Sequence, residues 1–318
     1  MKRFGHIYSK IYDYNNLELA YKNARRNKTF YREVKKVDAN PDEYLIQLQN
    51  MLIWKTYKTS EYEIFDLKDG DKVREIYKLP FFPDRICQWA IMLQIEKIFI
   101  DVFPFFTCAS IPNRGIHYAS DLTNKYINGP NAKYCLKIDI KKFFPNIDHE
   151  ILRFKLRQRF KDPDLLWLLD DIIYSIDGGK GIPIGNYTSQ YLANFYLKDF
   201  DWWIYEVMGF KQVVRYMDDI VVFDNSKPKL HKLRHEMERY LNRELKLELK
   251  ENYQVFPTKA RGVDFVGYRH FGDYTLLRKS TAKALKEKCK RIYKYTSKGK
   301  PITYSDFCSL NSYKGWIK

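Results

Sequence analysis

The sequence lacks the cysteine patterns that mark zinc sites and disulfide-stapled domains. Its five cysteines are scattered over 318 residues, and no two form a Cys-x-x-Cys pair. It also lacks an uninterrupted apolar stretch long enough to cross a bilayer, and its charged, aromatic N-terminus lacks the apolar core of a signal peptide. The most apolar segment, residues 86–106, is broken by polar side chains and predicts a buried helix. We therefore expect a cytoplasmic protein with no membrane partner.

The charge of the chain is strongly positive and uneven. The formal net charge is +17; residues 1–36 carry net +7 and residues 271–318 carry net +9, so the middle is nearly neutral. With 45% hydrophobic and 17% aromatic residues, the chain is globular. Basic ends around a neutral body predict a protein that binds a polyanion at its ends, and nucleic acid is favoured over a membrane as that polyanion. A merely soluble basic protein is the alternative.

Helical and strand patterns are interspersed, which predicts an α+β fold. Helices are expected within residues 1–60 and over about 82–102, 117–127, 164–174, 228–244 and 281–293, with another beginning at Asp148. A glycine-rich loop over 178–186 precedes a helix that Thr188 or Ser189 can cap and that continues to about 208. Strands are expected over 62–67, 72–79, 134–140 and 246–256, with hairpins over 212–223 and 261–269.

The hairpin over residues 212–223 predicts a site for cations. Its tip carries Asp218 and Asp219, and a strand that ends at Asp139 lies 79 positions earlier. If that strand lies beside the hairpin, three carboxylates meet over one sheet. Such a set suits two-metal phosphoryl transfer with two Mg²⁺ ions or Mn²⁺ in their place, and the carbonyl of Ile140 would be a further ligand. An ordinary turn with two solvated acids is the alternative.

Four segments, in order, resemble the sequence blocks of the reverse transcriptase family. Residues 72–76 resemble the fingers hairpin whose arginine binds the incoming triphosphate, although a charged edge strand would have a similar pattern. Residues 137–144 resemble the first catalytic-aspartate block, 216–219 the catalytic turn, and 263–268 the strand pair that grips the primer end. The resemblance covers about residues 62–269.

The resemblance implies a right-hand polymerase fold with an antiparallel palm sheet flanked by helices. Residues 1–60 would form a basic helical N-terminal extension and residues 61–133 the fingers. Residues 134–270 would form the palm, with about 150–187 contributing to the fingers, and residues 271–318 a short basic thumb. The implied activity is RNA-directed DNA synthesis from dNTPs, on a template RNA and an RNA–DNA duplex.

Roles for individual residues follow from the same resemblance. The catalytic and metal-binding acids would be Asp139, Asp218 and Asp219. Phe144 would be an aromatic steric gate against the 2′-hydroxyl of ribonucleotides, with a core phenylalanine as the alternative. Lys250 is a candidate proton donor to pyrophosphate, because Asn252 and Tyr253 occupy the places where relatives have lysines. The other substrate-binding residues would be Lys72, Arg74, Ile184, Gly185, Gln190, Tyr216 and Met217.

The glycine loop departs from the usual reverse transcriptase pattern. Ile184 stands where most relatives have glutamine, and Gln190 stands where they have proline. This pair resembles the reverse transcriptases of diversity-generating retroelements, from bacteria, archaea or their phages. These enzymes copy a template-repeat RNA with errors at adenines, for mutagenic retrohoming that diversifies a target gene, and they require a small basic helical accessory protein.

An apolar side chain at position 184 cannot supply the polar contact that glutamine makes with the nascent pair. We therefore expect relaxed fidelity. A neutral substitution in an accurate enzyme is the alternative. A retron-type, phage-defence or group II intron-derived reverse transcriptase also has these blocks. A non-enzymatic RNA-binding protein on a polymerase fold is disfavoured, because all three acids are present.

Overall fold

The computed structural model describes residues 3–69 and 72–317, and the chain divides into two compact units. The first unit comprises Met1–Phe105, Ile140–Val207 and Glu236–Leu249. The second comprises Phe106–Asp139, Met208–His235 and Lys250–Lys318. Helices and antiparallel strands both occur, as the α+β prediction requires. In the described part of the chain, no helix combines the length and the apolar character needed to cross a membrane.

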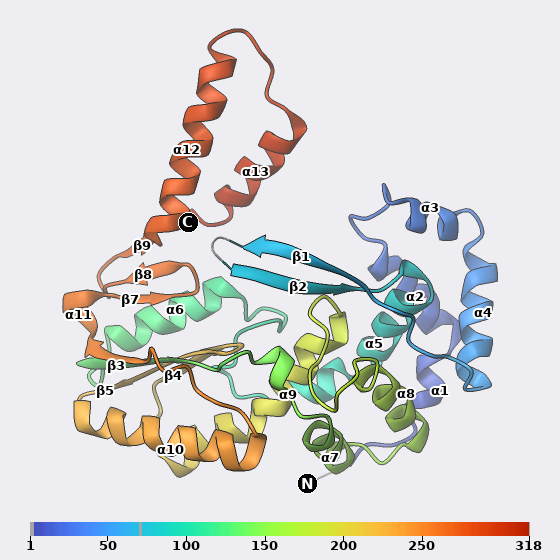
Figure 1. Cartoon of the computed structure of the whole chain (residues 1–318), viewed down its shortest axis with the longest axis horizontal. Helices are drawn as coiled ribbons and strands as arrows, with labels where there is room; N and C mark the ends of the chain where they lie inside the picture. Colours follow the sequence, from blue (N-terminus) through green and yellow to red (C-terminus); the bar gives the residue numbers. More distant parts are fainter. Residues whose placement is uncertain (1–2, 70–71, 318) are drawn as a thin grey trace. The chain divides into compact units, whose positions relative to one another are not determined.

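The first unit is mainly helical and is built around α5 (Ile86–Ile100), which contacts α2 (Tyr14–Ala24) and α9 (Tyr187–Trp202). Apolar residues occur on all sides of α5, as expected of a helix buried in a core. Phe99 of this helix contacts Phe160 and Phe195, with ring centroids 5.8 and 4.9 Å apart. The other helical segments of this unit are α1 (Tyr8–Ile11), α3 (Arg32–Asp38), α4 (Pro41–Ile53), η1 (Phe81–Arg85), η2 (Phe144–Asn146), α7 (His149–Arg159), α8 (Pro163–Ile173) and η3 (Trp203–Val207) (Figure 1).

Local capping chemistry predicts the helix start at one of two sites and fails at the other. The Asp148 side chain accepts a hydrogen bond from the backbone of Ile151 and begins α7, which confirms that prediction. The prediction that Thr188 or Ser189 caps the next helix is wrong. Both are buried inside α9, because Gln88 of α5 already accepts the hydrogen bond of the Tyr187 amide, 3.0 Å away, and the helix begins there.

A two-stranded hairpin also belongs to the first unit. Strands β1 (Glu63–Asp69) and β2 (Lys72–Lys78) pair antiparallel, in a register that sets Glu63 opposite Lys78. The predicted strand–turn–strand segment is therefore confirmed in its strands. The turn at residues 70–71 lies outside the described residues. So do the side chains of Lys72 and Arg74, and their predicted contacts stay predictions.

The second unit contains a four-stranded antiparallel sheet in the order β4-β5-β3-β6. Helix α6 (Ile116–Ile127) packs against β4. The helix α10 (Lys227–Leu245) follows β5 and belongs partly to each unit. The strands are β3 (Tyr134–Asp139), β4 (Val213–Tyr216), β5 (Asp219–Asp224) and β6 (Gln254–Pro257).

The strand predicted over residues 246–256 is shorter in the structure. Only β6, at its C-terminal end, pairs with β3, and residues 251–252 form a turn. Leu249 contributes a single isolated bridge to Ile140. The charged run Lys250-Glu251 interrupts the alternation that a paired strand needs, and the chain turns at this point.

Short strands and three helices end the described part of the second unit. The predicted hairpin is confirmed as β7 (Val263–Phe265) and β8 (Tyr268–His270), after α11 (Thr258–Arg261). Only glycine fits at its turn, because a Cβ on Gly267 would lie 2.2 Å from the ring of Trp316. The structure adds β9 (Thr275–Leu277) and α13 (Tyr304–Lys314) to the expected basic helix α12 (Lys279–Thr296).

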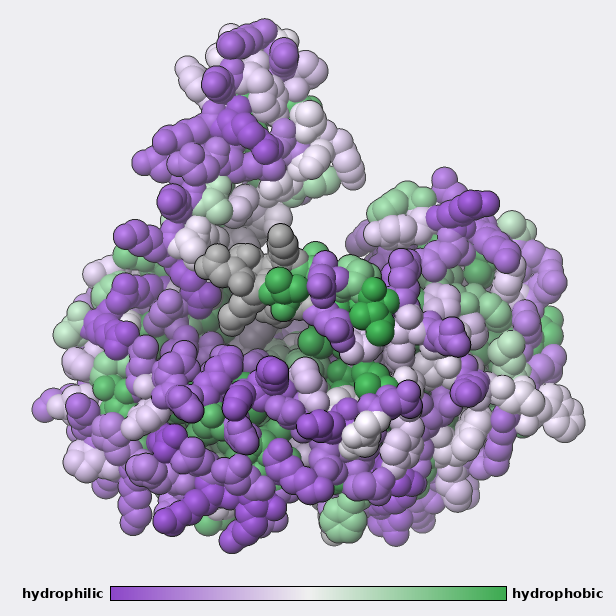
Figure 2. All heavy atoms as spheres, viewed as in Figure 1, coloured by the Kyte–Doolittle hydropathy of each residue, from purple (hydrophilic) through white to green (hydrophobic). Residues whose placement is uncertain are grey.

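The helices α12 and α13 are held together by a polar cluster. Asp306 of α13 is buried, and hydrogen bonds from surrounding side chains hold the pKa of its carboxyl well below the usual range. Its partners are Tyr295, Lys288, Thr303 and Arg291. Figure 2 shows the surface of this helix pair as mostly hydrophilic, in keeping with the positive charge predicted for the C-terminal segment.

Candidate active site

The sheet of the second unit brings the first catalytic-aspartate candidate beside the acidic hairpin. Strand β3 ends at Asp139, which lies directly opposite Asp219, the first residue of β5. Strands β4 and β5 are joined by the two-residue turn Met217-Asp218, since Tyr216 pairs with Asp219. The prediction that the strand bearing Asp139 lies beside the hairpin is confirmed. Asp218 lies in the turn itself.

Arg215 supports this turn, a role that the sequence analysis missed. Its side chain is fully buried, and its Nη1 donates a 2.9 Å hydrogen bond to the carbonyl of Met217. Met217 has φ +54°, a left-handed conformation that costs a non-glycine residue about 1–2 kcal/mol. The guanidinium bond offsets part of that strain. The sequence signal that could have indicated this role is an arginine between Val214 and Tyr216 in an otherwise apolar strand.

Burial and neighbouring charge set the protonation of Asp219. Burial raises the pKa of its carboxyl to about 6; Lys137 opposes that rise, and Asp139 and Asp218 add to it by like-charge repulsion. Lys137 Nζ lies 3.5 Å from Asp219 Oδ2 and donates a 2.5 Å hydrogen bond to the carbonyl of Asp264.

Asp139 has a lysine partner of its own. Lys250 Nζ forms an ion pair with its carboxylate, and the Lys250 amide donates a 2.9 Å hydrogen bond to its carbonyl. The structure therefore places the predicted proton-donor candidate at the predicted metal ligand. Neither Lys137 nor the contact of Lys250 could be found from local sequence patterns, because both arise from strand pairing.

The donor chemistry of these acids suits a divalent cation. Asp219 Oδ1 is buried and has no hydrogen-bond partner among the described residues, and a buried carboxylate oxygen of this kind is stabilised by a cation. Hard oxygen ligands from adjacent strands are the type that Mg²⁺ prefers. As they stand, no three His, Cys, Asp or Glu side chains in residues 3–69 and 72–317 form a group that could hold a metal ion. The metal site therefore stays a prediction.

The predicted nucleotide-selectivity residues lie in the first unit. Phe144 and Ile184 are half-buried, and Gly185 and Gln190 are exposed. The Tyr77 amide of β2 donates a 2.9 Å hydrogen bond to the carbonyl of Ile184, which ties the glycine loop to the β1–β2 hairpin.

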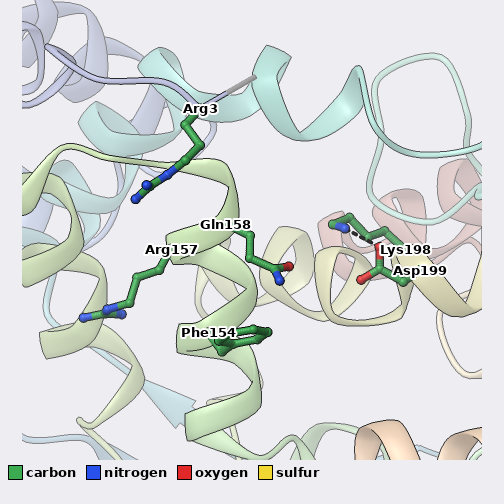
Figure 3. A pocket seen from close by; sticks show the side chains of 6 residues that line it. All are labelled: Arg3, Phe154, Arg157, Gln158, Lys198 and Asp199. Atoms are coloured by element: carbon green, nitrogen blue, oxygen red, sulfur yellow. Dashed lines mark hydrogen bonds and ion pairs between the residues drawn. The ribbon is translucent and has the colours of Figure 1, made fainter. Parts of the chain in front are cut away.

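The first unit has surface pockets, of which one is lined by a predicted site residue and another is not. One of about 190 Å³ lies between β2, the start of α5 and Gly185, and is lined by Arg85 and Gln88 among others. A wider one of about 560 Å³ lies between α7 and α9 and contains no predicted site residue. Figure 3 shows Phe154 and Gln158 on one side of it and the ion pair of Lys198 with Asp199 on the other.

Comparison with known proteins decides the family. Residues 67–270, more than half of the chain, match the family described as reverse transcriptase (RNA-dependent DNA polymerase). The chain belongs to the reverse transcriptase family. Its mixed architecture of helices and antiparallel sheet is the palm and fingers fold of that family, which confirms the predicted fold.

Curated relatives of this reverse transcriptase domain include proteins of several kinds. It is 24% identical over 239 residues to Protein YkfC of Escherichia coli K12, covering 71% of this chain and 56% of that protein. It is 27% identical over 197 residues to the group II intron-encoded protein LtrA of Lactococcus lactis, covering 59% of this chain and 31% of LtrA. It is 33% identical over 108 residues to the retron Ec73 reverse transcriptase of Escherichia coli, covering 30% and 34% of the two chains. The chain thus spans about half of YkfC and about a third of LtrA.

A solved structure shares the fold. Telomerase from Candida albicans, in complex with a fragment of telomeric RNA, matches 70% of this chain and 46% of its own, with a TM-score of 0.50 and 9% identity. At that identity the likeness concerns the fold alone.

Proposed function

We propose that this chain is an RNA-directed DNA polymerase that incorporates dNTPs on an RNA template. The observation that carries the proposal is the register that sets Asp139 opposite Asp219, next to the turn that holds Asp218, in a member of the reverse transcriptase family. These three acids, with the carbonyl of Ile140, would hold two Mg²⁺ ions. When bound, such ions activate the attacking 3′-hydroxyl and stabilise the leaving pyrophosphate.

The chain's own residues prepare this site for cations and substrate. Lys137 keeps part of the negative charge on Asp219 despite burial, and Arg215 holds the turn in its left-handed conformation. Lys250 is proposed as a proton donor to the leaving group. Tyr216, the last residue of β4, and Met217, the first residue of the turn, are proposed to contact the substrate. The support is their match to the family's catalytic turn.

The remaining assignments rest on the family resemblance. Phe144 is proposed to exclude ribonucleotides, and Lys72 and Arg74 to bind the triphosphate. Residues 61–133 with about 150–187 are proposed as the fingers, 134–270 as the palm, 271–318 as the thumb and 1–60 as a basic extension.

Primer extension tests the activity. The purified chain, with Mg²⁺, a primed RNA template and dNTPs, should extend the primer, and Asp219→Asn should reduce the rate at least about 1,000-fold, because several kcal/mol of charge stabilisation is lost. The matched control is Asp224→Asn, the same exchange at the other end of β5. Extension by Asp219→Asn at the rate of the unaltered chain would contradict the metal assignment, and no extension by the unaltered chain would contradict the activity.

We further propose that the chain is the mutagenic reverse transcriptase of a diversity-generating retroelement. Ile184 and Gln190 support this proposal through their resemblance to that subclass. The partners would be a template-repeat RNA and a small basic helical accessory protein, in the cytoplasm of a bacterium, an archaeon or a phage-infected cell. An intron- or retron-type enzyme of ordinary fidelity is the competing proposal, because LtrA and the Ec73 enzyme are among the relatives.

Sequencing the cDNA distinguishes these two proposals. The mutagenic proposal predicts more errors at template adenines than at other bases, and fewer of them after Ile184→Gln, which restores a polar contact. Equal error rates at all four bases, unchanged by the substitution, would favour the accurate enzyme.

A further inference from the structure

The glycine loop, residues 178–186, is bonded to the segment that carries Phe144. The loop and residues 144–149 run antiparallel, with a bridge between Asp148 and Lys180. Three backbone hydrogen bonds of 2.8–3.1 Å join them, from the amides of His149, Gly181 and Ile182 to the carbonyls of Gly179, Ile147 and Phe144, respectively. Since the Ile184 carbonyl is bonded to β2, one hydrogen-bonded piece of backbone carries both Phe144 and Ile184.

His149 adds a side-chain hydrogen bond between the start of α7 and this loop. Its ring is completely buried, and Nε2 lies 2.6 Å from the carbonyl oxygen of Gly181. A carbonyl can only accept, so Nε2 carries the hydrogen. The ring packs edge-on against Tyr174, with centroids 5.3 Å apart. Nδ1 is buried without a hydrogen-bond partner among the described residues, so the polar function of this side chain is directed at the loop.

The glycine loop needs a contact that restricts its backbone, because its glycines are conformationally free. Gly178, Gly179 and Gly181 all have positive φ, and a Cβ on either of the first two would meet nothing within 4 Å. Glycines in open space have many accessible conformations, and ordering them is unfavourable in entropy. A buried donor aimed at the Gly181 carbonyl selects one conformation of this stretch.

We propose that His149 is a positioning residue for nucleotide selectivity. Its hydrogen bond holds the glycine loop in register with residues 144–149 and thereby fixes Phe144 and Ile184 relative to each other. This inference rests on the proposed function, in which Phe144 faces the sugar and Ile184 the nascent pair. His149 touches no substrate and acts through these two residues.

The competing explanation is a histidine that only stabilises the fold. Loss of a purely structural contact lowers stability and reduces the rate with every nucleotide alike. Loss of a positioning contact changes the ratio of rates between right and wrong nucleotides, because a displaced gate discriminates less while the catalytic acids are untouched.

Three variants separate the two explanations. His149→Phe keeps a ring for Tyr174 but has no donor, and His149→Gln keeps an N–H donor of comparable reach. His235→Phe makes the same exchange at an exposed position of α10 and is the matched control. If His149→Phe does not fold, His149→Asn, a shorter donor, takes its place.

Two measurements are made on each full-length variant. Hydrogen exchange detected by mass spectrometry reports the protection of residues 178–186. Steady-state single-nucleotide extension gives kcat and KM for the matched dNTP, the corresponding rNTP and a mismatched dNTP.

We expect the loop amides of His149→Phe to exchange faster. We also expect two ratios of kcat/KM, matched dNTP over rNTP and matched over mismatched dNTP, each to fall roughly three- to tenfold, the range that one hydrogen bond supports. The kcat for the matched dNTP should stay within about threefold, and His149→Gln should recover most of the loss. Unchanged loop exchange, or a uniform rate loss with both ratios intact, would overturn the inference. If the unaltered chain makes no DNA, the proposed function fails and the selectivity role with it, while the exchange data still decide whether His149 holds the loop.

Discussion

Replacing Gly185 by alanine tests the contact between the glycine loop and β2. Gly185 has φ +123°, and a Cβ built on it would lie 2.7 Å from the backbone carbonyl oxygen of Tyr77. The contacted atom belongs to the main chain of β2, so it cannot swing aside as the end of a side chain can. The same stretch of backbone carries the hydrogen bond from the Tyr77 amide to Ile184.

The expected loss of stability has two parts. The left-handed backbone costs an alanine about 1–2 kcal/mol. Gly178 isolates that part, because it has φ +96° and an added Cβ would meet nothing within 4 Å. At Gly185 the clash adds about 1–3 kcal/mol, and weakening the Tyr77 hydrogen bond adds about 1 kcal/mol. Gly185→Ala should therefore destabilise the protein by about 3–6 kcal/mol, and Gly178→Ala by about 1–2 kcal/mol.

Differential scanning calorimetry can compare the two variants, because it detects whether the two units melt separately. The expected difference of about 2–4 kcal/mol corresponds to roughly 4–16 °C in Tm for a unit of this size. Faster hydrogen exchange at Tyr77 in Gly185→Ala would locate the effect. Equal losses of stability in the two variants would show that a Cβ at position 185 does not clash with the Tyr77 carbonyl, and would refute the reasoning.

Two further predictions concern the second unit. Burial lowers the pKa of His270 to about 4 from its usual 6.5, so between these values the unfolded chain binds a proton that the folded chain does not. Asp219 gives the opposite slope over much of this range, because burial raises its pKa to about 6, so the contribution of His270 is the difference between the unaltered chain and His270→Gln. Relative to His270→Gln, the unaltered chain should lose up to about 3 kcal/mol of stability as the pH drops from 6.5 to 4 and nothing above 6.5; urea unfolding of both proteins at several pH values measures this difference. Asp306→Asn should raise the hydrogen exchange of α13 toward the unprotected rate, because it removes the charge that holds that helix to α12, whereas the exposed Asp273→Asn should leave it unchanged.

The parts of the site that were predictable from sequence are those encoded by short, local patterns. Apolar β-branched runs on both sides of Met217-Asp218 predict the hairpin. The strand that ends at Asp139 could be expected to pair with this hairpin, because few other strands were predicted as partners for it. Asp148 predicts the start of α7 from sequence alone, because an N-cap side chain bonds only to the next three residues.

The parts that were not predictable depend on contacts between distant segments. The pairing of residues 144–149 with the glycine loop joins positions 30 to 38 residues apart, and no period in either segment indicates it. The start of α9 at Tyr187 was misplaced for the same reason, because its cap comes from Gln88, 99 residues away. Local propensity offered Thr188 and Ser189 as caps, and a tertiary contact overrode it.

The two lysines beside the acids explain how the sheet forms around like charges. Carboxylates on adjacent strands repel each other, and burial adds a desolvation penalty, so without compensation they would be protonated or would separate. Lys250 contacts Asp139 and Lys137 approaches Asp219, which supplies one cation for each strand. The compensation is incomplete, because the pKa of Asp219 still stands at about 6 and one of its oxygens has no hydrogen-bond partner among the described residues. A sheet that forms with lysines as its cations, yet keeps an uncompensated buried carboxylate oxygen, can combine stable folding with the divalent-ion binding that we propose.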